Sequence, residues 1–98
     1  MYKNTGINYI VIDEIQKIAK ECNIKKVILF GSRARGDYKE RSDIDLAVSG
    51  GKTGEFTINV DEKTSTLLKF DVVNLDVPNQ MELLDTIQKE GIIIYEKI

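Results

Sequence analysis

Residues 31–48 read GSRARGDYKERSDIDLAV, and two features of this stretch decide how the chain is interpreted. The first is a glycine-flanked turn that begins with Gly31 and Ser32. The second is an Asp-x-Asp pair, Asp43 and Asp45, at the start of an apolar segment. The stretch therefore predicts a turn that can hold an anion, followed by a strand that begins with two carboxylates.

The segments around this stretch predict alternating helices and strands. Apolar residues at spacings of three and four predict an amphipathic N-terminal helix, and they are Ile7, Ile10, Val11, Ile15, Ile18, Ala19 and Cys22. Asn23 is a plausible left-handed stop for it. Short apolar runs predict strands at 27–30, 43–48, 69–75 and 92–95. Between the first two strands, we expect one or two helical turns ended by Gly36 and then a polar loop.

Two further segments require interpretation. Residues 55–66 fit a strand, because Phe56 and Ile58 alternate, but Phe56 and Val60 also fit one face of a helix. The sequence from Asn79 onward has the pattern of a capping box and predicts a helix that ends at Gly91. Its predicted buried face is Met81, Leu84 and Ile87.

Composition excludes several classes of site. The chain of 98 residues is 42% hydrophobic, which suits one domain over residues 1–98. It has no histidine and a single cysteine, Cys22, so histidine-based catalysis and cysteine metal clusters are excluded. A net charge of −2 argues against stable DNA binding. No apolar run approaches membrane-spanning length and the N-terminus lacks a signal layout, so we expect a cytoplasmic protein.

The glycine turn has the properties of a phosphate site. Gly31 allows a sharp turn and a close approach by a ligand, because it has no Cβ. Ser32 offers an amide and a hydroxyl where a short helix begins, and such positions favour anions. Arg33 and Arg35 could complement phosphate charge, although helical geometry points them in different directions. We expect at most one of them to contact the nucleotide.

Carboxylates supply the metal side of the predicted site. Asp43 and Asp45 lie on one face of their strand, where like charges repel and a divalent cation would offset the cost. Magnesium binds through one or two carboxylates together with substrate phosphates. Asp71 interrupts the third strand and can face the same cleft if the two strands are neighbours. It would then bind the catalytic metal and help remove a proton from an attacking hydroxyl.

Each feature alone has an ordinary structural explanation. A Gly-Ser turn is usually a loop without a ligand, and an Asp-x-Asp pair is commonly a solvated strand edge. Their order along the chain is less easily accidental: strand, turn, short helix, Asp-x-Asp strand, then a strand with a third aspartate. We therefore interpret the set as a site for a nucleoside triphosphate and magnesium.

Residues 31–48 resemble the signature of the polymerase-beta-like nucleotidyltransferase superfamily, and the short chain resembles its minimal branch. The resemblance implies an α/β (α+β) fold, a small mixed sheet of about four strands with helices on one side and the site at the sheet edge. It implies transfer of AMP from ATP to a hydroxyl, with two Mg²⁺ ions. Gly31 and Ser32 match the phosphate turn, and Asp43, Asp45 and Asp71 match the metal carboxylates.

Many minimal members are similar to antitoxins that modify a tyrosine of a partner HEPN-domain ribonuclease toxin. The resemblance thus implies an adenylyltransferase antitoxin in a hetero-oligomer with such a toxin. Since the chain has little room beyond a catalytic core, the acceptor should arrive on another protein, and we expect an exposed apolar patch for it. Two alternatives stay open: a binding module that only masks its partner, and nucleotidyl transfer to a small molecule or RNA end.

Overall fold

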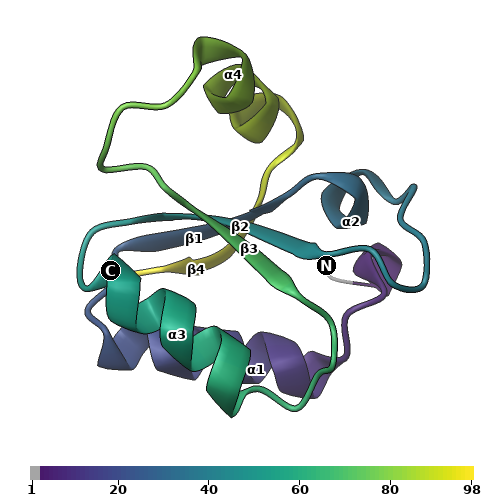
Figure 1. The fold of residues 1–98 in the computed structure, drawn as a ribbon, viewed down its shortest axis with the longest axis horizontal. Coiled ribbons are helices and arrows are strands. Elements are labelled where there is room, and N and C mark those ends of the chain that lie inside the picture. Colours follow the sequence, from purple (N-terminus) through teal and green to yellow (C-terminus); the bar gives the residue numbers. More distant parts are fainter. Residues whose placement is uncertain (1–2) are drawn as a thin grey trace.

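The computed structural model describes residues 3–98 and contains one sheet with helices on both faces (Figure 1). In chain order the elements are η1 (Lys3–Thr5), α1 (Tyr9–Glu21), β1 (Lys26–Phe30), α2 (Ser32–Arg35), β2 (Ile44–Ser49), α3 (Thr53–Lys63), β3 (Phe70–Asn74), α4 (Met81–Glu90) and β4 (Ile92–Glu96). The predicted fold class, a small mixed sheet of four strands flanked by helices, is confirmed.

The sheet has the strand order β3-β2-β1-β4. Strand β1 is antiparallel to both β2 and β4, whereas β2 and β3 are parallel. The β2–β3 crossover contains α3, as a parallel connection requires. The turn between β1 and β2 therefore lies at the same end of the sheet as the first residues of β2 and β3.

The main core lies between the sheet and the helices α1 and α3, which both cover one face (Figure 1). Leu29, Leu46 and Val48 point to this face from β1 and β2, and each is fully buried. Ile15 of α1 and Phe56 of α3 are also fully buried against it. Because successive strand residues alternate between faces, the odd-numbered residues of β2 point to the other side.

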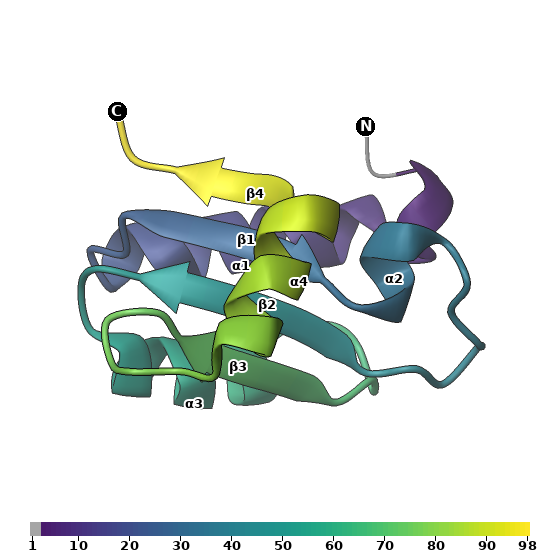
Figure 2. The same cartoon turned by 90° about the horizontal axis from the view of Figure 1, so that it is seen from above.

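Helix α4 crosses the strands on that other side, as Figure 2 shows from above. The cluster beneath it is small, with only Phe30, Ala47 and Ile87 buried among the described residues. The expectation of helices on one side of the sheet is therefore wrong. The amphipathic α4 has an apolar stripe of its own, and it buries Leu83 and Ile87 against the second face.

The structure differs from the sequence-based expectations at several element boundaries and agrees with them at others. The N-terminal helix begins at Tyr9 rather than Ile7, and Asn23 has the left-handed φ of 56° expected of its stop. Most of the ambiguous 55–66 segment belongs to the helix α3, which ends at Lys63, with Phe56 and Val60 buried one turn apart. The last strand, β4, is an edge strand in which only Ile94 is buried.

The capping-box prediction for α4 is wrong. Gln80 occupies the cap position without a side-chain hydrogen bond. Asn79 instead donates from Nδ2 to the carbonyls of Asn74 and Val77, at 2.9 Å each, and closes the loop after β3. The predicted buried face was also wrong in part, because Met81 and Leu84 are 83% and 40% exposed and only Ile87 is buried.

Within residues 3–98, no helix is both long enough and apolar enough to cross a membrane.

Candidate active site

Two of the three predicted metal carboxylates lie directly opposite each other. In the parallel β2–β3 register, Asp45 is paired with Asp71. Parallel neighbours in register point to the same face, and adjacent strands are about 4.8 Å apart. Asp43 precedes β2 by one residue and lies two positions before Asp45, so the alternation of strand side chains directs it to that face as well. The structure therefore brings the three predicted carboxylates together.

These carboxylates lie on the face of the sheet that α4 crosses. Along β2 and β3 the next residues on that face are Ala47 and Val73, which pack against α4 residues. Asp71 belongs to the edge strand β3, while Asp45 belongs to an inner strand. The carboxylates thus extend from the sheet edge inward, with Asp43 and Asp71 exposed and Asp45 half-buried.

Asp45 carries the clearest electrostatic signature of the site. Burial, and then the negative charges of Asp71 and Asp43, raise its pKa to about 6 from an ordinary value of 3.8. Arg35 opposes this effect and Glu90 adds to it. Negative charge is therefore concentrated around Asp45 beyond what the neighbouring cation balances, as expected for carboxylates that await a positive ligand.

The predicted phosphate turn lies against Asp45. Gly31 has φ 78° and ψ −158°, a conformation that side-chain-bearing residues rarely adopt. A Cβ at this position would collide with Oδ2 of Asp45. A glycine is therefore required for two reasons, the turn itself and the close approach of the carboxylate.

Ser32 follows as the first residue of α2, a helix of four residues ended by Gly36 in the left-handed conformation. The first amides of a helix have no partner within it. The Ser32 side chain is half-buried. An amide and a hydroxyl are thus present beside Asp45, where a phosphate would approach.

Arg33 has a different environment from the one predicted. Its side chain is 2% exposed, and its guanidinium donates to the carbonyl oxygens of Thr5 (2.9 Å), Ser42 (3.0 Å) and Glu40 (3.2 Å). The guanidinium carbon also lies 4.8 Å from the ring centroid of Tyr38. These contacts argue against the predicted phosphate-binding role of Arg33. Its role is structural, because it fixes the loop that leads to Asp43.

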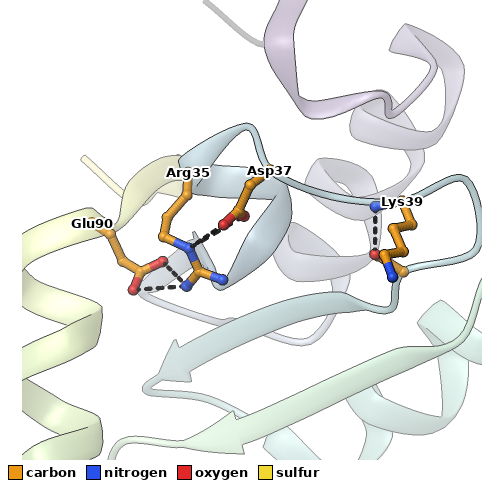
Figure 3. Close-up of polar contacts among 5 residues, drawn as sticks. Arg35, Asp37, Lys39 and Glu90 are labelled. Atoms are coloured by element: carbon orange, nitrogen blue, oxygen red, sulfur yellow. Dashed lines mark hydrogen bonds and ion pairs between the residues drawn. The ribbon is translucent and has the colours of Figure 1, made fainter.

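Arg35 points to α4 instead (Figure 3). Its Nε donates to Asp37 at 3.2 Å, and its Nη1 donates to the Glu90 carboxylate at 2.9 Å. Since Arg35 also lowers the pKa of Asp45, its charge is within electrostatic reach of the site. The expectation that the two arginines diverge is confirmed.

Glu90 is the residue near the site that sequence reasoning missed. Its side chain is only 17% exposed at the end of α4. One sequence signal was available, because a carboxylate is unfavourable next to the negative end of a helix dipole and so requires a compensating partner. Arg35 is that partner.

The arrangement suits a cation that arrives with its substrate. Among the residues that the structure describes, no three acidic, cysteine or histidine groups form a ready-made metal cage. Magnesium needs no such cage, since it binds through one or two carboxylates plus phosphate oxygens and water. The oxygen donors of Asp43, Asp45 and Asp71 are of the type this ion prefers, and the phosphate turn is adjacent. The residues present therefore fit magnesium.

Comparisons with known proteins agree with this geometry. Residues 13–98 match the family model described as "Polymerase beta, Nucleotidyltransferase". The chain is 40% identical over 81 residues to "Putative protein adenylyltransferase MJ0604" of Methanocaldococcus jannaschii, an alignment that covers 74% of this chain and 79% of that protein. A shorter stretch of 35 residues is 51% identical to "Putative protein adenylyltransferase MJ0141" of the same organism, covering 36% and 34% of the two chains.

Solved structures share the fold. A toxin-antitoxin crystal structure with AMP-PNP has a TM-score of 0.71 at 21% identity, covering 88% of this chain and 73% of that one. A mutant form of the toxin-antitoxin MntA-HpeT has a TM-score of 0.72 at 19% identity, covering 93% and 75%. At such identities the likeness concerns the fold alone. The family model, in contrast, spans most of the sequence, and this chain therefore belongs to the polymerase beta nucleotidyltransferase family.

Proposed function

We propose that this protein transfers AMP from ATP to a tyrosine hydroxyl of a partner HEPN-domain toxin and thereby acts as its antitoxin. The observation that carries the proposal is the in-register pair Asp45 and Asp71 beside the Gly31 turn. Support for a protein acceptor comes from the relative at 40% identity, whose name is a protein adenylyltransferase. Toxin-antitoxin structures of the same fold support the partner class.

Each site residue has a role in this reaction. Gly31 and Ser32 bind the β- and γ-phosphates through backbone amides and the hydroxyl. Asp43, Asp45 and Asp71 would hold two magnesium ions, which supply charge neutralisation of the triphosphate and orient its oxygens. Asp71 also accepts the proton of the attacking hydroxyl. The hydroxyl oxygen forms a bond to the α-phosphorus, the bond to the bridging oxygen breaks, and pyrophosphate leaves.

In this proposal the partner supplies the acceptor. The elements of residues 3–98 are the sheet and its covering helices, and the acceptor would bind on their surface. Large apolar side chains are exposed on α4 and in the loop before it, namely Val77, Met81 and Leu84. Exposed apolar surface of this kind is typical of protein contacts.

The test is labelling of a HEPN-domain partner protein, with ATP radiolabelled at the α-phosphate. Asp45→Asn and Asp71→Asn should each reduce labelling by about 10²–10³-fold or more, because each removes a charged group required in the transition state. Asp61→Asn, on the exposed surface of α3, is the matched control and should label normally. Full labelling by Asp45→Asn would refute the assigned chemistry. Toxin neutralisation that persists without any labelling would instead favour simple masking.

A further inference from the structure

A hollow of about 540 Å³ lies beside the carboxylates, where β2 and β3 begin. It is lined by Arg41, Asp43, Leu67, Leu68 and Lys69. The amide of Ile44 donates to the carbonyl of Lys69 at 2.8 Å, so the two segments that form its walls are joined there. We call this hollow the entry groove. The proposed binding of phosphates and magnesium does not involve Leu67, Leu68, Lys69 or Arg41.

The entry groove lies on the side where an acceptor must approach. Phosphoryl transfer places the attacking and leaving oxygens roughly in line. The pyrophosphate side is fixed by the Gly31 turn, which follows β1, on one side of Asp45. Strand β3 and the entry groove are on the other side of β2. An attacking hydroxyl opposite the turn therefore comes from the direction of the entry groove.

The lining of the entry groove has a distinctive chemistry. Leu67 is fully exposed to solvent, and Leu68 is half-buried beside it. Arg41 and Lys69 are exposed cations, and in residues 3–98 neither forms a salt bridge. Apolar walls with two unpaired cations are complementary to an apolar or aromatic side chain flanked by acidic groups.

A nucleic-acid end fits the groove less well. Lys69 also lines a second hollow, of about 490 Å³, whose α3 wall carries Asp61 and Glu62. Those carboxylates would repel a phosphate backbone that continued past Lys69. A peptide, in contrast, does not carry a negative charge at every residue. It can place acidic side chains beside Arg41 and Lys69 and uncharged ones near Asp61 and Glu62.

We propose that the entry groove binds the acceptor segment of the partner protein, with the modified tyrosine against Leu67 and Leu68 and an acidic flank beside Arg41 and Lys69. The proposal rests on the proposed function, since it names the substrate class of the same site. It makes Arg41 and Lys69 specificity-determining residues for the acceptor, with no part in binding the triphosphate.

The experiment compares two fluorescein-labelled tyrosine peptides of equal length, one flanked by glutamates and one by lysines. Their binding is measured by anisotropy with Mg²⁺ and a non-hydrolysable ATP analogue. The acidic peptide should bind at least about tenfold more tightly than the basic one, and Arg41→Glu combined with Lys69→Glu should reverse that preference. Lys17→Glu combined with Lys20→Glu, on α1 beneath the other face, is the control and should keep it.

The outcomes separate this proposal from the proposed function. Equal binding of both peptides, or binding of neither, overturns the entry groove as an acceptor site, whatever the labelling assay shows. Tighter binding of an oligoadenylate than of the acidic peptide also overturns it. The affinity for fluorescent ATP should be unchanged in the Arg41→Glu and Lys69→Glu double variant. A loss of ATP affinity in this double variant would show that the groove binds the nucleotide, and would overturn the proposal. The transfer chemistry itself is tested separately, by the labelling assay with Asp45→Asn.

Discussion

The two faces of the sheet differ in what they contain. The face covered by α1 and α3 holds a continuous core of aliphatic residues with Phe56, whereas the face crossed by α4 buries only Phe30, Ala47 and Ile87 among the described residues. All three candidate metal carboxylates lie on the second, thinly covered face. Stability is thus concentrated on one face and charge on the other. Such a division allows the sheet to tolerate repulsion between Asp45 and Asp71, because packing beneath it holds the strands in register.

The largest effect should come from truncating one leucine on each side of the sheet, Leu46 in the main core and Leu83 on α4. Leu46→Ala should lower the free energy of unfolding by about 3–5 kcal/mol, because Leu46 is fully buried against the core under α1 and α3. Leu83→Ala, at the partly buried contact of α4, should cost about 1 kcal/mol. Urea unfolding monitored by circular dichroism measures both. Equal costs would show that the α4 face contributes as much stability as the core.

The next effect separates the two arginines of the turn. Arg33→Met should cost about 3 kcal/mol, because it removes the buried hydrogen bond to the Thr5 carbonyl and the part-buried ones to Ser42 and Glu40. Arg35→Met should cost much less, since Arg35 is exposed and solvent screens its ion pairs. Unfolding in urea measures each difference. A smaller cost for Arg33→Met than for Arg35→Met would contradict the structural role given to Arg33.

The third effect is a gain in stability on removing a charge. The folded protein holds the Asp45 proton more tightly than the unfolded chain, with a pKa of about 6 against 3.8. Between these pH values the folded state binds a proton that the unfolded state has lost, so the free energy of unfolding falls as pH rises. The resulting penalty is complete above about pH 6 and absent below about pH 4.

Asp45→Asn cannot ionise and should escape this penalty. We expect it to be more stable than the wild type by about 1–2 kcal/mol at pH 8, after allowance for solvent screening, with the difference disappearing near pH 4. Thermal melts across this pH range measure it, and Asp61→Asn is the control. Mg²⁺ should raise the melting temperature of the wild type more than that of Asp45→Asn. A constant difference at all pH values would mean that ionisation of Asp45 is not the cause.

The same contrast between faces explains what the sequence could predict. The strands and α1 were predictable because their core face imposes a clear apolar periodicity, as at Ile15 and Leu46. The buried face of α4 could not be predicted in the same way. Leu83 and Ile87 contact the sheet and Met81 is exposed, but the spacing of apolar residues in this helix is equally compatible with Met81 being buried. Asn79 was misassigned because loop closure through Asn74 and Val77 competes with helix capping.

The candidate site shows the same limit. Asp43, Asp45 and Asp71 were predictable as neighbours because strand alternation and adjacency determine where they point. The structural role of Arg33 could not be predicted. The local sequence does not distinguish an arginine that donates to the carbonyls of Thr5 and Glu40 from one that binds phosphate. The burial of Arg33 depends on the Thr5 carbonyl, 28 residues away along the chain, as well as on the loop that follows α2. Long-range partners of this kind are the part of the site that periodicity does not encode.

The smallest effect concerns the ion pair that joins the turn to α4. Arg35→Gln and Glu90→Gln should each change stability only slightly, because solvent screens the exposed guanidinium of this pair. Their effects on Asp45 should nevertheless have opposite signs. Arg35→Gln removes a cation and should raise the pKa of Asp45 above about 6, whereas Glu90→Gln removes an anion and should lower it.

The pKa of Asp45 in these variants is measured by following its carboxyl carbon resonance through a pH titration. Lys89→Gln is a matched control, because it breaks the exposed Lys89–Asp85 pair on the same helix and should leave Asp45 unaffected. If both Arg35→Gln and Glu90→Gln shift the pKa in one direction, the cause is a movement of α4 rather than the removed charge. If the shifts are opposite, α4 acts on the thinly covered face through charge as well as through packing. Glu90, at the end of α4, then belongs to the electrostatic environment in which Asp45 would bind a cation.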